Sequence, residues 1–70
     1  MITFELKENS EYIELIKLLK ATNLASSGAQ AKQMVEDGIV MVNNETEMRK
    51  RAKIRKGDVV RLMDNEITVK

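Results

Sequence analysis

The spacing of apolar residues changes near Gly38 and divides the chain into a helical part and a strand-rich part. Apolar residues recur at helical spacing within residues 11–22, and again in a segment that begins at Ser26 or Ser27. After Gly38 come short β-branched runs bounded by turn-forming residues, a pattern typical of strands. An alternating run at residues 2–6 predicts one more strand before the helices. This order predicts an α+β fold, in which a helix pair packs on one side of a small, mostly antiparallel sheet.

Both predicted helices carry signals for their ends. Asn9 or Ser10 can cap the first helix, and Asn23 is expected to end it. In the second helix, Ser27 and Gln30 fit a capping box, in which the serine hydroxyl accepts from the amide three residues on and the glutamine side chain reaches back. The link between the helices is short, so they are expected to form a compact pair.

The second half of the chain is expected to form strands joined by tight turns. The predicted strands are 39–42, 49–54, 59–63 and 67–69, and the predicted turns are Asn43-Asn44, Lys56-Gly57-Asp58 and Asp64-Asn65. Gly38 is expected to take the left-handed conformation that ends the second helix.

The residue types that are missing argue against catalysis. The chain has no cysteine and no histidine, so thiolate metal ligands and the commonest general base are absent. Its 70 residues are expected to form a single domain, 1–70, with a thin core and little room for a pocket. We therefore expect no enzyme activity, no cofactor, no metal and no small-molecule substrate.

Two further absences concern location. No apolar run approaches the roughly 18 residues of a membrane span, and the N-terminus shows no secretory signal. A cytoplasmic protein without membrane association is therefore expected.

Positive charge is concentrated in one stretch, although the net charge is only +1. Six of the 12 lysines and arginines fall between residues 49 and 56, with no acid among them. We call this stretch the basic segment, and its cations are Arg49, Lys50, Arg51, Lys53, Arg55 and Lys56. A solvated surface is the plain interpretation of a charge run, but an uninterrupted run on a near-neutral domain favours binding to a polyanion.

As a strand, the basic segment would place cations on one face and apolar residues on the other. The outward set would be Arg49, Arg51, Lys53 and Arg55, and the inward set Ala52 and Ile54. Cations on one side of a strand recur about every 6–7 Å, a spacing that can follow a phosphate backbone.

The start of the second helix predicts an anion site. The amides near Ser26, Ser27 and Gly28 lie at the positive end of the helix dipole, and the glycine lets a phosphate approach the backbone closely. Gln30 could contact a phosphate or a base, or could serve only in the capping box, and both interpretations stay open.

Three lysines on the predicted helices have alternative roles. Lys32 is interpreted as a phosphate ligand rather than a partner of Glu36, because a lysine N-terminal to a glutamate is the weaker orientation for a helix pair. Lys17 lies near Glu14 and is expected to be a solvated cation, whereas Lys20 is kept as a secondary candidate.

Phe4 and Tyr12 are the only aromatic residues, and both occupy expected core positions. Sequence-selective binding to single-stranded RNA usually uses exposed aromatic side chains on which bases stack. Recognition is therefore expected through phosphates, ribose hydroxyls and the shape of a structured RNA. Charge alone does not distinguish RNA from DNA.

Three stretches of the sequence resemble a known RNA-binding family. They are LASSGAQAKQMV at 24–35, DGIVMVN at 37–43 and KGDVV at 56–60. Together they resemble the domain named after ribosomal small-subunit protein S-four, whose helix pair, strand and hairpin form the alpha-L motif. The resemblance covers residues 11–62, and GAQAK with RKRAKI is similar to the small stand-alone bacterial members, the YbcJ-like proteins.

The resemblance implies an RNA-binding face made from the second helix and the basic segment. It places there Ser27, Gln30, Lys32 and Gln33 from the helix, and Arg49, Lys50, Arg51 and Lys53 from the segment. Many members carry arginine or lysine at the position of Gly28, so one helix cation is missing here. The catalytic domains of larger members do not fit in 70 residues, which implies binding without modification.

We therefore predict a monomeric, non-catalytic protein that binds structured RNA, with ribosomal RNA or its precursor as the target, in ribosome assembly or RNA metabolism. The alternative is a protein-interaction module that docks an acidic partner through the same charges. The predicted contacts are Ser27, Gln30, Lys32, Gln33, Arg49, Lys50, Arg51, Lys53 and Arg55, with Lys20, Ser26, Gly28 and Lys56 as secondary candidates.

Overall fold

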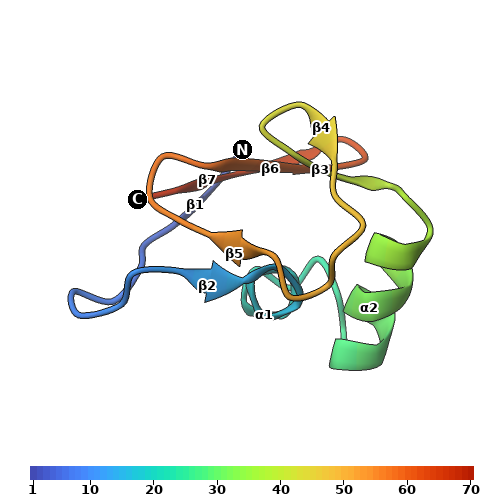
Figure 1. Cartoon of the computed structure of the whole chain (residues 1–70), viewed down its shortest axis with the longest axis horizontal. Helices are drawn as coiled ribbons and strands as arrows, with labels where there is room; N and C mark the ends of the chain where they lie inside the picture. The colour runs from blue at the N-terminus through green and yellow to red at the C-terminus, as the bar shows by residue number, and fades with distance from the viewer.

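Two helices and two sheets, one large and one small, make up the fold, and the computed structural model describes all 70 residues (Figure 1). The elements in chain order are β1 (Ile2–Phe4), β2 (Ile13–Glu14), α1 (Leu15–Ala21), α2 (Gly28–Glu36), β3 (Val40–Val42), β4 (Glu45–Thr46), β5 (Lys53–Ile54), β6 (Val59–Leu62) and β7 (Asn65–Val69). The large sheet has five strands in the order β1-β7-β6-β3-β4, and the small sheet consists of β2 paired with β5. All neighbouring strands are antiparallel except β1 and β7. The predicted α+β class with a mostly antiparallel sheet is confirmed.

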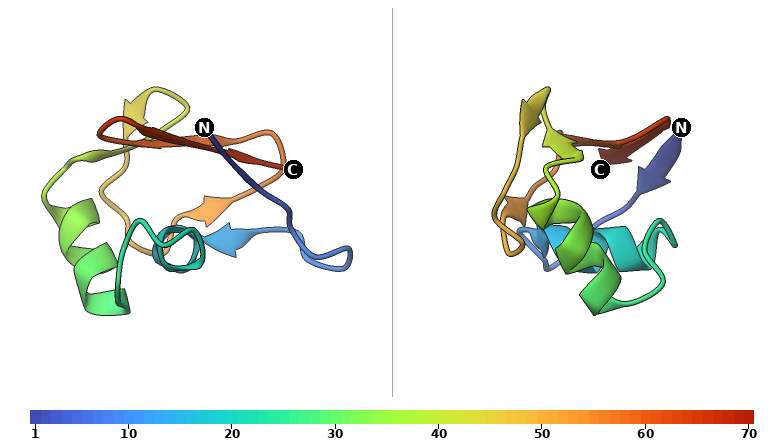
Figure 2. Two further views of the ribbon diagram at one scale, coloured as in Figure 1. Left: turned by 180° about the vertical axis from the view of Figure 1, so that it is seen from behind. Right: turned by 90° about the vertical axis from the view of Figure 1, so that its right-hand side faces the viewer.

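The core lies between the five-stranded sheet and the layer formed by α1, α2 and the β2–β5 pair (Figure 2). Every buried residue is apolar, and no polar or charged side chain is buried. The largest fully buried side chains are Leu15, Leu18, Leu19, Val35, Val40, Ile54, Val60, Ile67 and Val69. Both helices lie on the same side of the large sheet, as the sequence predicted, so the other side of that sheet faces solvent.

The first helix is shorter than predicted, because its expected first turn is a strand instead. α1 begins at Leu15, and neither Asn9 nor Ser10 caps it. Ile13 pairs with Ile54 across the small sheet. This tertiary pairing overrides the helical spacing of the apolar residues, which periodicity alone cannot reveal. Asn23 does follow the end of α1, with a left-handed φ of 63°.

The predicted strand at 49–54 is also wrong for most of its length. Only Lys53 and Ile54 form a strand, and residues 50–51 form a turn. The turn is closed by the Ala52 amide, which donates to the Arg49 carbonyl at 3.1 Å, and the carbonyls of Lys50 and Ala52 accept from the first amides of α1. The inward placement of Ala52 and Ile54 is confirmed, with exposed fractions of 6% and 1%.

The turns of the second half agree with the sequence except at one hairpin. Asn43 and Asn44 have φ values of 51° and 70°, and Gly38 has 73°. The turn before β7 occupies residues 63–64, one residue earlier than predicted, with Met63 at a φ of 56°. Because Asn43-Asn44 reverses the chain tightly, it also creates β4, a short strand that the sequence analysis missed.

Neither α1 nor α2 has the length and apolar character needed to cross a membrane. No cluster of three or more acidic, histidine or cysteine side chains is arranged to hold a metal ion.

Candidate nucleic-acid interface

The basic segment crosses the molecule as a turn, strand β5 and a second turn. The first turn packs on α1, where the Leu15 amide donates to the Ala52 carbonyl at 2.9 Å and the Ile16 amide donates to the Lys50 carbonyl at 3.2 Å. The second turn packs on the end of β7, where the Gly57 amide donates to the Val69 carbonyl at 2.8 Å. Backbone hydrogen bonds therefore fix both ends of the segment without using its cationic side chains.

Most cations of the basic segment have no acidic partner. Ion pairs in the structure join Lys17 to Glu14, Arg49 to Glu47, and Arg61 to Glu66. The unpaired cations of the segment are Lys50, Arg51, Lys53, Arg55 and Lys56, all exposed except the half-buried Lys50. Unpaired, exposed cations keep their full attraction for phosphate groups.

Arg49 differs from the other cations because Glu47 holds it. Its Nε donates to Oε2 of Glu47 at 3.1 Å and its Nη2 donates to Oε1 at 3.3 Å. These hydrogen bonds from Arg49 lower the pKa of the Glu47 carboxyl below its ordinary value and raise the pKa of the guanidinium. The arginine side chain remains 81% exposed, so the pair is a surface pair and not a buried one. Part of the charge at Arg49 is nevertheless neutralised within the protein.

The expected row of cations from Arg49 to Arg55 along one strand face does not form, since only two residues of the segment are a strand. Lys53 does point outward, and its ammonium lies 5.0 Å from the centroid of the Tyr12 ring. Tyr12 was predicted to be a core residue, and it is instead 39% exposed. The other aromatic residue, Phe4, is half-buried and packs against the core as expected. The outer face of the small sheet therefore combines cations with an aromatic ring.

The start of α2 has the predicted serine cap. The Gln30 amide donates to the Ser27 hydroxyl at 3.1 Å. The Gln30 side-chain oxygen accepts from the amide of Ser26, and from the Ser26 hydroxyl at 2.8 Å. The side chain of Gln30 thus reaches one residue further back than a capping box requires. Because the first intrahelical bond starts at Ala31, the amides of Gly28 and Ala29 have no partner within the helix.

Replacing Ser27 by alanine is expected to lower the free energy of unfolding by about 1 kcal/mol, because the Gln30 amide loses its acceptor. For a domain of this size, that loss corresponds to a fall in Tm of about 4–8 °C in a thermal melt. Ser27→Asn, which keeps a capping acceptor, is the control and should stay close to the wild type. Equal melting temperatures for wild type and alanine variant would show that the cap contributes nothing.

The remaining candidates on the helices differ in whether their side chains already have a partner within the protein. Gln33 donates from its side-chain amide to Asp37 at 2.8 Å, so it is engaged within the helix. Lys32 is exposed and forms no ion pair with Glu36. The plain interpretation of Lys32 as a partner of Glu36 therefore does not hold, and its charge is available.

The basic segment meets the first residues of α1, and the start of α2 meets its last turn. The first turn of the segment contacts the backbone of Ile16. A Cβ built on Gly28 would lie 3.9 Å from the Lys20 side chain. The segment therefore meets the N-terminal end of α1, whereas Gly28 lies beside Lys20 in the last turn of that helix. In Figure 1 the chain after β4 descends towards α1 with α2 beside it, in agreement with these contacts.

The second half of the basic segment lies further from α2. β5 leads away from both helices towards the end of β7 (Figure 1). Arg55 follows β5, and its amide donates to Asp58 at 2.8 Å. The structure thus places the turn at Lys50 and Arg51 against the first residues of α1 and Gly28 beside Lys20 in its last turn, whereas Arg55 and Lys56 lie further from α2.

Comparisons with family models, protein sequences and solved structures all point to the same family. The model of the S4 domain family matches residues 4–70. YbcJ from Escherichia coli strain K12 is 39% identical over 69 residues, which cover 99% of this chain and 97% of YbcJ. YbcJ from Shigella flexneri has the same identity and coverage.

The similarity extends to a solved structure. The solution structure of YbcJ from E. coli superposes with a TM-score of 0.75 and covers 99% of this chain and 86% of that chain. That protein is described as having an alpha-L motif involved in RNA binding. The resemblance noted from the sequence is therefore confirmed at the level of family and fold.

Proposed function

The chain belongs to the S4 domain family, and from that premise we propose that it is a non-catalytic protein that binds structured RNA. Its target is ribosomal RNA or a precursor of it. The contacts come from the start of α2 and from the basic segment. The observation that carries the proposal is the set of exposed cations without an acidic partner in the basic segment, whose two ends backbone hydrogen bonds fix to α1 and to β7.

Two groups of residues make different contributions to RNA binding in this proposal. Arg51, Lys53 and Arg55 contact phosphates, because guanidinium and ammonium groups donate strongly to phosphate oxygens. Lys20 and Lys32 extend the positive surface along the helix pair, next to the unpartnered amides of Gly28 and Ala29. Arg49 contributes less, since Glu47 already occupies its guanidinium.

RNA is favoured over an acidic protein partner because the YbcJ structure, which matches almost the whole chain, is described as having a motif involved in RNA binding. An acidic protein could bind the same cations, so nuclease treatment separates the two. Affinity purification from cells should recover RNA, and nuclease should release everything that copurifies. A protein that stays bound after nuclease treatment would favour the interaction module.

Affinity for a structured RNA should fall steeply with salt. If about four to six phosphates are neutralised, the affinity drops by about two to three orders of magnitude between 50 and 200 mM salt. Fluorescence anisotropy with a labelled RNA hairpin over a salt series gives this slope directly. A flat salt dependence, or equal affinity for duplex DNA of the same length, would contradict the proposal.

A further inference from the structure

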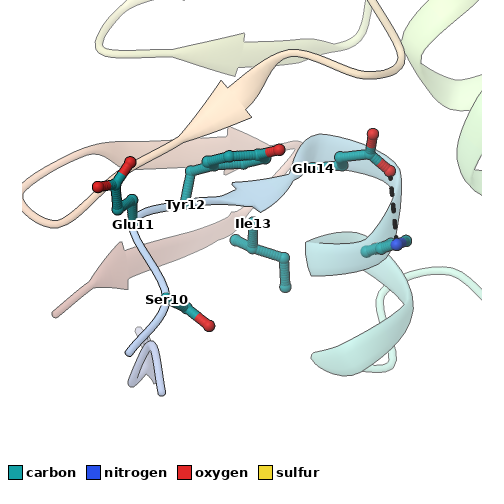
Figure 3. A pocket seen from close by; sticks show the side chains of 6 residues that line it. Ser10, Glu11, Tyr12, Ile13 and Glu14 are labelled. Carbon is teal, nitrogen blue, oxygen red and sulfur yellow. Dashed lines mark ion pairs between the residues drawn. The ribbon is translucent and has the colours of Figure 1, made fainter. Parts of the chain in front are cut away.

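An exposed aromatic ring borders a shallow hollow beside the basic segment (Figure 3). The hollow has a volume of about 350 Å³ and is lined by Ser10, Glu11, Tyr12, Ile13, Glu14 and Lys17. The ring of Tyr12 extends along β2 on the side opposite Ile13, which points towards the core (Figure 3). Tyr12 is the only tyrosine in the chain.

We propose that Tyr12 is a stacking platform for one unpaired nucleobase next to the RNA structure that the basic segment holds. This inference rests on the proposed function and adds a second kind of ligand contact to it. The occupant is an aromatic base from a single-stranded extension or bulge, not a further phosphate.

Cations that can hold the flanking phosphates stand next to the ring. The register pairs Glu14 with Lys53 and Ile13 with Ile54. Continued by one residue, it places Tyr12 opposite Arg55, and both side chains are exposed. A nucleotide stacked on the ring would therefore have a lysine and an arginine within reach of its backbone.

The lysine over the ring does not prevent stacking. Stacking of a base on an aromatic side chain contributes about 5- to 150-fold in affinity, whereas a cation over an exposed ring contributes about 2- to 5-fold. Lys53 is also not among the residues that line the hollow, so a base seated there need not displace its ammonium from the ring.

The two acidic residues that line the hollow favour a base over a phosphate as its occupant. Glu11 and Glu14 line it, and Glu14 is only partly offset by Lys17 at 3.6 Å. Two carboxylates repel a phosphate but accept hydrogen bonds from the amino group of a base such as cytosine. The hollow therefore suits the base, and the basic segment suits its phosphates.

The test compares an RNA hairpin that carries a single-stranded cytidine extension with the same hairpin without it. Tyr12→Leu should lower affinity for the extended hairpin at least about 5-fold and leave affinity for the blunt hairpin unchanged. Tyr12→Phe, which keeps the ring, should bind both like the wild type. Circular dichroism of each variant checks that the fold is intact.

Tyrosine fluorescence gives a second readout, because the chain contains one tyrosine and no tryptophan. Stacking should quench the emission of the wild type with the extended hairpin only. If the wild type binds both hairpins equally and its emission does not change, the stacking site is refuted while RNA binding stands. If the wild type binds neither hairpin, the proposed function itself fails and the stacking site with it.

Discussion

Replacing Arg51, Lys53 and Arg55 together by alanine should weaken binding to structured RNA on the order of a thousandfold. Each side chain is exposed and has no acidic partner, so in the complex it can donate to phosphate oxygens. A hydrogen bond to a charged group contributes about 1.5 kcal/mol at the low end, and three such contacts give this factor. The slope of log affinity against log salt should also become shallower by about three.

The control for this variant removes the same charge elsewhere. Lys7, Arg61 and Lys70 lie outside the basic segment, and their joint replacement by alanine lowers the net charge equally. Binding measured at one salt concentration should then change little, because these positions make no phosphate contact in the proposal. If both triple variants lose the same affinity, attraction is set by overall charge and the basic segment has no special role.

Replacing Ile54 by alanine should cost about 2–5 kcal/mol of folding free energy. Ile54 is 1% exposed and joins the small sheet to the core through its pairing with Ile13. A domain of 70 residues has roughly 3–10 kcal/mol of stability in total. The substitution therefore removes a large share of the stability, and it loosens the strand that carries Lys53.

Urea unfolding measures this cost, and two substitutions serve as references. Ile54→Val should lose only about 0.5–1.5 kcal/mol, because a single methylene is removed. Met63→Ala, at a turn residue that is largely exposed, should be close to neutral. An Ile54→Ala variant as stable as the wild type would mean that β5 does not pack on the core.

Local chemistry made some elements predictable from the sequence. Ser27 caps α2 because its hydroxyl can reach the Gln30 amide, whatever the rest of the fold does. Asn43 and Asn44 take positive φ values because asparagine tolerates them at low cost. Such features depend on neighbouring residues only, and they were predicted correctly.

Elements that depend on distant partners were not predictable in the same way. β2 has two residues, and it exists because residues 53–54 lie beside it. The apolar spacing around Tyr12 and Leu15 favours a helix and therefore predicts a core position for Tyr12. The ring of Tyr12 is exposed instead. The Arg49–Glu47 pair did have a signal, since residues two apart in an extended segment share a face. The turn at residues 50–51 had none, because it contains no turn-forming residue, although a local hydrogen bond closes it and two more hold it against α1.

We predict that RNA contacts the basic segment and the start of α2. Titration of the ¹⁵N-labelled protein with a structured RNA, followed by amide chemical-shift mapping, tests it most directly. The largest changes are predicted at residues 26–33 and 50–55. Changes that instead cluster on the solvent-facing side of the five-stranded sheet, around Thr3, Arg61 and Thr68, with the basic segment unaffected, would contradict it.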